Sequence, residues 1–241
     1  MRALPASLKG CEISTYAAAG FFCCACLPTA PNAGEVDTLL FGSLDAAAAT
    51  FVTTGAKIGL PSLDRDGAVA LASLGGGREI ERGPDGTARR YTATGAVVLG
   101  YQWFFDWGVV AAFIGPEVST QMLTNRRESV SLPTLMGLRA HGEIWARPTE
   151  DTLLQATMVA GTALESLWAR AAWGYRLWDT YLGPELSLYT DATGYRKWNF
   201  GLHGTDFDLG CFSFRVAAGV QTETDRRTAG PYLSLSVWSP W

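Results

Sequence analysis

The segment from Cys211 to Gln221 alternates between two kinds of side chain. One face of an extended chain here carries Phe212, Phe214, Val216, Ala218 and Val220, and the other carries Cys211, Ser213, Arg215, Ala217, Gly219 and Gln221. A period of two over about ten residues is typical of a strand in a transmembrane β-barrel, which crosses the bilayer in about 9–11 tilted residues. The apolar face is then expected to contact lipid and the polar face to line a lumen.

The composition supports a barrel rather than a helical membrane protein or a water-soluble domain. Hydrophobic residues make up 48% and charged residues 17% of the chain, yet no apolar run approaches the roughly 20 residues of a transmembrane helix. Lys9, Lys57 and Lys197 are the only lysines among 19 Lys and Arg residues. Because arginine suits paired, partly buried positions, this bias indicates little lysine-rich solvated surface. The net charge of −4 predicts no nucleic-acid partner.

Residues 1–33 are predicted to be a secretory signal peptide, and residues 34–241 the mature barrel. Arg2 and Lys9 precede a short apolar stretch at 16–27, and small residues follow at 28–34, which is the order of such leaders. Cleavage is expected near Ala33 or Ala30, and the alternative is the first amphipathic helix of a soluble domain. Four of the five cysteines lie in this leader. Cys211 alone then remains, so neither an internal disulfide nor a cysteine-based metal site is expected.

The mature chain is predicted to form a single antiparallel up-and-down barrel. Its twelve expected strands are 36–44, 50–59, 68–80, 91–103, 107–119, 134–146, 151–161, 166–178, 181–190, 197–207, 210–221 and 229–238. Long connections (81–90, 120–133, 191–196 and 222–228) alternate with short ones (104–106, 147–150, 179–180 and 208–209), as outer loops and periplasmic turns do in outer-membrane barrels. Ten strands remain the alternative if the first pair lies outside the wall.

Aromatic residues gather at the short turns. They are Trp103, Phe104, Phe105, Trp107, Trp145, Trp178, Tyr181 and Trp238. Such rings are typical of the membrane interface, whereas the tryptophans of a soluble β-sandwich would lie at strand centres. These residues are therefore expected to form the inner aromatic girdle.

Strand alternation places one set of polar side chains in the lumen. The candidate network is Glu117, Arg139, His141, Glu143, Arg170, Arg176, Glu185, His203 and Arg215. Arginine and carboxylate side chains form directional, often bidentate pairs, and Arg176 is expected to face Glu185 across the turn at 179–180. A lumen crossed by such pairs is expected to be polar but obstructed, with little or no conductance.

Catalysis is not the expected role of these residues. His141 and His203 are the only histidines, and Ser213 and Asn199 are the groups that could complete a hydrolase arrangement. No Gly-x-Ser-x-Gly elbow accompanies them. The lumenal glutamates could be read as a glycosidase pair, but carboxylates neutralised by arginine are the preferred interpretation. No catalytic residue, metal or cofactor is predicted.

Two hairpins resemble each other, and their motifs belong to a wider pattern. Both contain Gly-Tyr before a tight turn, at 100–101 and 174–175, and Gly-Pro-Glu after it, at 115–117 and 183–185. Proline lacks an amide donor, so a bulge or a strand end is expected at each Gly-Pro-Glu.

Further segments join these motifs in a characteristic order. They are Leu-Asp-Arg-Asp-Gly at 63–67, Gly-Gly-Gly-Arg at 75–78, Gly-Tyr-Gln-Trp at 100–103, Phe-Ile-Gly-Pro-Glu-Val at 113–118, Gly-Tyr-Arg-Leu at 174–177, Leu-Gly-Pro-Glu-Leu at 182–186, Tyr-Arg-Lys-Trp at 195–198 and Gly-Leu-His at 201–203. In order and spacing the chain resembles the cellulose biosynthesis protein BcsS family. The resemblance implies an accessory protein of bacterial cellulose production in the outer membrane, and it brings no catalytic residues.

The function expected from these observations is a non-enzymatic outer-membrane component that supports cellulose secretion or its attachment at the cell surface. The alternatives are a small general diffusion channel and a lipid- or glycan-modifying barrel enzyme. Cellulose, or components of its secretion machinery, and outer-membrane lipids are the expected partners. Arginines of the outer loops suit lipopolysaccharide phosphates or are simply solvated: Arg82, Arg89, Arg90, Arg126, Arg127, Arg226 and Arg227.

Overall fold

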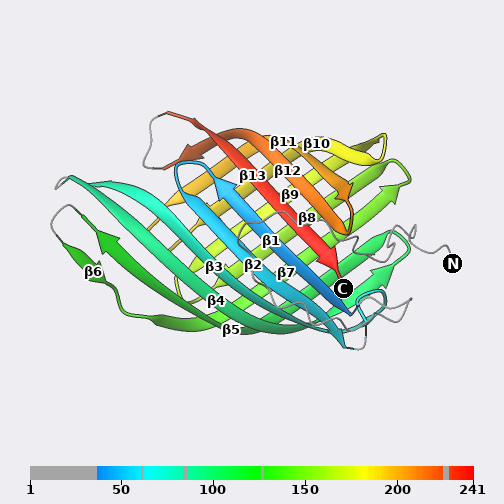
Figure 1. Ribbon diagram of the computed structural model, residues 1–241, viewed down its shortest axis with the longest axis horizontal. Coiled ribbons are helices and arrows are strands. Elements are labelled where there is room, and N and C mark those ends of the chain that lie inside the picture. Colours follow the sequence, from blue (N-terminus) through cyan, green and yellow to red (C-terminus); the bar gives the residue numbers. More distant parts are fainter. Residues whose placement is uncertain (1–36, 61, 84–85, 126–127, 225–227) are drawn as a thin grey trace, which may run out of the picture.

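A computed structural model describes residues 37–60, 62–83, 86–125, 128–224 and 228–241 (Figure 1). The predicted signal peptide at 1–33 and its cleavage site lie outside these residues. So do four of the seven arginines assigned to the outer loops, at 126, 127, 226 and 227. No helix in the described part of the chain is long and apolar enough to span a bilayer.

The described residues form thirteen antiparallel strands, and twelve of them close into a barrel. The first six strands of the chain are β1 (Thr38–Ala46), β2 (Thr50–Leu60), β3 (Gly67–Gly83), β4 (Gly86–Phe105), β5 (Gly108–Thr124) and β6 (Ser129–Ser131). The others are β7 (Leu135–Thr149), β8 (Thr152–Gly161), β9 (Ser166–Leu177), β10 (Thr180–Thr190), β11 (Arg196–Leu209), β12 (Phe212–Glu223) and β13 (Gly230–Pro240). Pairing of β1 with β13 closes the wall, while the short β6 pairs with β5 alone, beyond the end of β7. The predicted twelve-stranded barrel is confirmed, and its first two strands lie in the wall.

The ends of the barrel differ as expected (Figure 1). The first wall strand begins and the last one ends where the connections are short, and Thr38 and Trp241 exchange backbone hydrogen bonds there. The opposite end is uneven because β3, β4 and β5 are much longer than their neighbours.

The predicted loop at 81–90 is wrong, because β3 extends to Gly83 and β4 begins at Gly86. The β3–β4 ladder continues without a break to the pair Gly83 and Gly86, and β5 continues to Thr124. Charged residues in these strands had suggested a loop, but a strand that projects beyond the membrane carries charges on both faces without burying them.

The outward face is mainly apolar along the middle of the wall. Its most exposed aliphatic side chains include Leu74, Leu99, Ile114, Met136 and Leu202, at 67%, 62%, 62%, 83% and 68% of their full area. Monomeric proteins in water rarely expose contiguous apolar patches of this extent, whereas a lipid-facing barrel wall requires them. The faces predicted for β5, β7 and β12 are confirmed by this pattern.

The predicted inner girdle is correct in part. Trp103, Phe105, Trp107 and Trp178 are exposed at the short-turn end. Tyr181 is only 5% exposed and points into the barrel. Trp145 and Trp238 also point inward, because they continue the inward faces of β7 and β13. Such a ring points inward when it lies an even number of residues from other lumenal residues of its strand, however close it is to a turn.

Candidate functional site: the barrel lumen

Arg139 and Glu117 form the first charged pair of the lumen. They lie on the neighbouring strands β7 and β5, and Arg139 Nε is 3.0 Å from Glu117 Oε2. Arg139 also donates to Ser73 Oγ at 3.4 Å, while Glu117 Oε1 accepts the Ala163 backbone amide at 2.9 Å. The pair thereby fixes the β8–β9 turn against the wall.

Lys57 and Glu143 form a second pair, and it crosses the lumen. The Lys57 ammonium lies 2.7 Å from Glu143 Oε2, although β2 and β7 are separated by β3, β4 and β5. Glu143 Oε1 is 3.2 Å from His141 Nε2, and the Lys57 ammonium lies 5.3 Å from the centroid of the Phe113 ring. One lysine therefore ties together three parts of the inner wall.

Arg215 and Glu185 form the most deeply buried pair. Arg215 donates to Glu185, and their side chains are 4% and 3% exposed. Because an ion this buried loses its hydration, it is tolerated only when a partner neutralises it.

The predicted contact between Arg176 and Glu185 is wrong. The turn between β9 and β10 consists of two residues, with Trp178 at φ +56°, so Leu177 pairs with Thr180 and Arg176 with Tyr181. Glu185 lies opposite Ala172 instead. Arg176 is half exposed at the short-turn end, 3.8 Å from Asp179, and does not belong to the lumen network.

The remaining predicted residues lie on the lumenal face. His203 and Thr205 are 3% and 0% exposed. Arg170 has no carboxylate partner among the described residues, and its guanidinium lies 5.6 Å from the centroid of the Trp168 ring. All nine predicted residues belong to the inward face, since Arg176 lies opposite the inward Tyr181, but they form separate clusters rather than one network.

In both Gly-Pro-Glu segments the glutamate forms an ion pair with a lumenal arginine, Glu117 with Arg139 and Glu185 with Arg215. The ladder to the preceding strand is interrupted at Gly115–Pro116 and again at Gly183–Pro184. A Cβ at either glycine would lie 2.2 or 2.0 Å from a backbone oxygen of that strand, so only glycine permits this approach. The predicted bulge or strand end is not found, because each strand continues through its proline.

Aromatic and aliphatic side chains fill the lumen toward the short turns. Val69, Leu71, Val98, Ala111 and Phe113 form a buried cluster, against which Phe41 and Leu63 pack. Leu63 belongs to the turn after β2, whose Ser62 is fully buried. The Gln102 amide holds this turn inside by donating to the Arg65 carbonyl at 2.9 Å.

A tryptophan pair spans the barrel at the same end. The rings of Trp145 and Trp238 meet edge to face, with centroids 6.0 Å apart. Their strands, β7 and β13, lie six positions apart in the wall by either route. Since twelve strands enclose more space than the interior side chains of a small barrel fill, direct contact across the full width places both rings in the middle of the lumen, which they obstruct.

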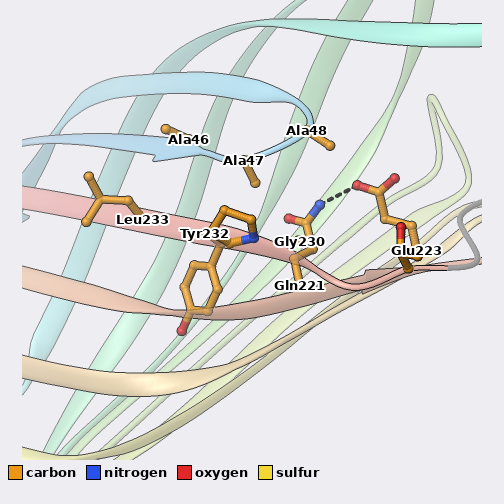
Figure 2. Close-up of a pocket in the computed structure, with 10 residues that line it drawn as sticks. Ala46, Ala47, Ala48, Gln221, Glu223, Gly230, Tyr232 and Leu233 are labelled. Carbon is orange, nitrogen blue, oxygen red and sulfur yellow. Dashed lines mark hydrogen bonds between the residues drawn. The ribbon is translucent and has the colours of Figure 1, made fainter.

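The outer end of the lumen is more open. A cavity of about 500 Å³ lies between the β1–β2 turn and the ends of β12 and β13 (Figure 2). Ala46–Ala48 line one side of it, and Gln221, Glu223 and Tyr232 the other. The Gln221 amide donates to the Glu223 carboxylate, as the dashed line in Figure 2 marks.

The groups considered for hydrolysis do not meet. Ser213 donates to Asp208 at 2.6 Å and lies opposite it in the ladder, whereas His203 lies opposite Ala217. The Asn199 amide donates to Ser187 at 2.9 Å. Within the described residues no group of three or more His, Cys, Asp or Glu side chains is arranged to hold a metal ion.

Several residues of the lumen were not identified from the sequence. Lys57, Trp168, Tyr189 and the Trp145–Trp238 contact were all missed. The alternation within β9 and β10 already places Trp168 and Tyr189 inward. Contacts across the lumen, by contrast, leave no signal in the sequence of either strand.

Solved structures similar to this chain include the KdgM porin, at 9% identity and a TM-score of 0.45, covering 84% of this chain and 99% of that one. The β domain of the Bordetella autotransporter Brka has 12% identity and a TM-score of 0.48, covering 87% and 100%. The translocator domain of the autotransporter NalP from Neisseria meningitidis has 13% identity and a TM-score of 0.48, covering 85% and 88%.

Comparison of sequences is more specific. No curated protein matches the chain. The model of one protein family, described as cellulose biosynthesis protein BcsS, matches residues 39–241. The match begins in β1 and ends at the last residue, so it covers the whole barrel.

Proposed function

The chain belongs to the cellulose biosynthesis protein BcsS family, and on this premise we propose that it is a non-enzymatic accessory barrel of the outer membrane. It supports the attachment of cellulose at the cell surface rather than conducting the polymer through its lumen. The leader at residues 1–33 directs its export, and the barrel assembles in the outer membrane with its short turns toward the periplasm.

The observation that carries this proposal is the closed lumen. Trp145 meets Trp238 across the full width of the barrel, and Lys57 bridges to Glu143 between β2 and β7. The apolar cluster around Phe113 fills further space. A glucan chain would have to displace these side chains together.

The outer surface supports a location in the membrane. Apolar side chains cover the middle of the wall, and tryptophans are exposed at its short-turn end. Trp198 and Phe200 stack at 6.1 Å toward the outer end of β11 and are also outward. Two aromatic zones around an apolar band are typical of outer-membrane barrels.

Lipopolysaccharide is the lipid partner that the arginines suit. Arg78 and Arg89 are exposed on the outward face of β3 and β4, close to each other because Arg89 lies opposite Ile80. Neither makes an ion pair with a described residue, so both guanidinium groups can bind phosphate oxygens in bidentate fashion. They stand beyond the apolar band, at the level where lipid headgroups lie.

A deletion strain tests the proposed role. Removal of the gene is expected to leave cellulose synthesis and release intact while less polymer remains on washed cells, as measured by dye binding to cell and medium fractions. Retention of the polymer should be restored only by a reintroduced protein that fractionates with the outer membrane. Normal retention in the deletion strain would contradict the proposal, and loss of release with polymer trapped in the periplasm would favour a conduit instead.

A further inference from the structure

Two rows of inward side chains cross four neighbouring strands, β9 to β12, at the outer rim. In the upper row Trp168 of β9, Tyr189 of β10 and Lys197 of β11 are direct cross-strand neighbours. Adjacent strands lie about 4.8 Å apart, so Trp168 and Tyr189 leave the wall at neighbouring positions, with the Arg170 guanidinium 5.6 Å from the Trp168 ring centroid and the Lys197 ammonium 5.7 Å from that of Tyr189. Tyr195 extends this aromatic surface, with its ring centroid 6.1 Å from that of Tyr189.

The lower row is polar. It consists of Arg170, Ser187, Asn199 and Gln221, which are again direct neighbours on successive strands. Asn199 donates to Ser187 at 2.9 Å, but its own amide oxygen is buried and has no partner among the described residues. The Arg170 Nε is likewise buried without one. Donors and acceptors therefore remain directed into the lumen below the aromatic rings.

The upper row lies near the outer ends of its strands, while Ser187 and Gln221 of the lower row are buried, each 5% exposed. Tyr189 is one residue from the end of β10, and Trp168 is two residues from the start of β9. Both side chains are partly exposed. Gln221 and Glu223, at the β12 end of the two rows, also line the outer cavity of about 500 Å³ (Figure 2). We name the aromatic pair together with the polar row, which ends at this cavity, the rim platform.

We propose that the rim platform binds a segment of a β-linked glucan. The flat, apolar face of a pyranose ring stacks on an aromatic ring, and its hydroxyl groups need donors and acceptors beside that ring. Trp168 and Tyr189 supply the first requirement, and Ser187, Asn199 and Gln221 the second. Lys197 lies opposite Glu223, so this cation has a carboxylate beside it.

This inference rests on the proposed function, because it gives the attachment of cellulose a site. The glucan would enter from the outer face and remain there, since the lumen is closed below by Trp145 and Trp238. A site that is open only outward holds a polymer without transporting it.

Calorimetric titration of the full barrel in detergent with cellohexaose tests the platform. Cellohexaose should bind, and the α-linked maltohexaose should bind much more weakly. Trp168→Ala and Tyr189→Ala should each weaken binding about tenfold, from the loss of one stacking surface, whereas Trp168→Phe should retain most of it. The matched control is Trp198→Ala, which removes an outward-facing ring of β11 at the same, outer end of the barrel.

Heat-modifiable gel mobility identifies variants that remain folded, and only these are compared. Absence of cellohexaose binding by the folded wild-type barrel would overturn the inference, as would equal binding of maltohexaose. Equal affinity of Trp168→Ala, Tyr189→Ala and wild type would place the glucan elsewhere and also refute it. If the deletion strain still loses attached cellulose in these cases, the proposed function stands without this site.

Discussion

Replacement of Glu185 by Gln should destabilise the barrel strongly. The carboxylate of Glu185 is the ion-pair partner of Arg215, and the two side chains are 3% and 4% exposed. Removal of its charge leaves a guanidinium that is buried and uncompensated, since Arg215 Nε and Nη1 have no other hydrogen-bond partner among the described residues. The cost of breaking such a pair is about 3–5 kcal/mol.

Urea-induced unfolding of the refolded barrel in detergent measures this effect. The unfolding midpoint of Glu185→Gln should fall well below that of the wild type, with an unchanged slope. The matched control is Arg176→Gln, which removes a charge whose side chain is 48% exposed and whose partner, Asp179, is fully exposed. Screening by water makes that pair worth little, so the control should unfold with the wild type.

A second variant separates the ion pair from simple loss of packing. The double replacement Glu185→Leu with Arg215→Met removes both charges and keeps the volume, and it should recover most of the lost stability because no unpaired ion remains. If Glu185→Gln unfolded together with Arg176→Gln, the buried-pair reasoning would be refuted. Failure of the double variant to recover would show that more than charge pairing is involved.

Three further predictions concern the wall and its closure. Leu202→Arg places a charge on the lipid face of β11, where the leucine is 68% exposed, and should cost about 2–4 kcal/mol near the bilayer midplane; Leu209→Arg, at the interface end of the same strand, should cost about 0–1 kcal/mol. Protection of the folded band from protease in lipid vesicles compares the two, and equal effects would contradict the assigned membrane position. Gly183→Ala should reduce the yield of folded barrel, because its Cβ would lie 2.0 Å from the Trp173 carbonyl oxygen, whereas Gly142→Ala meets no atom within 4 Å and should fold normally. Gel mobility after refolding measures both yields, and normal folding of Gly183→Ala would show that the wall is looser than described. Trp145→Ala with Trp238→Ala removes the ring contact across the lumen and should let small solutes into vesicles faster than the wild-type barrel does; unchanged uptake would mean that other groups close the passage.

The strands could be predicted from the sequence because their signal is local. Alternation placed β9 at 166–178, and the structure has Ser166–Leu177. It also sorted Arg139, His141 and Glu143 to the lumen, since a lipid-facing charge is costly. The same reasoning missed the projecting part of β3 and β4, because strands above the membrane are free of that constraint and carry charges on either face.

Pairings between side chains could not be predicted in the same way. The partner of Glu185 depends on the register of the β9–β10 hairpin, which the two-residue turn at Trp178 and Asp179 sets. The observed register differs from the predicted one by a few residues, so Arg176 lies opposite Tyr181 and cannot reach Glu185. Lys57 with Glu143 and Trp145 with Trp238 are separated by four and six positions around the wall. Such contacts depend on the diameter and tilt of the closed barrel, which no single strand encodes.

Single-barrel recording in planar lipid bilayers tests most directly the claim that the lumen is closed. With the Trp145–Trp238 contact, the Lys57–Glu143 bridge and the cluster around Phe113 in place, the wild-type barrel should show little or no steady current. The Trp145→Ala, Trp238→Ala double variant serves as the positive control and should open measurably. A large, steady open-pore conductance of the wild-type protein would contradict the account and favour a diffusion channel.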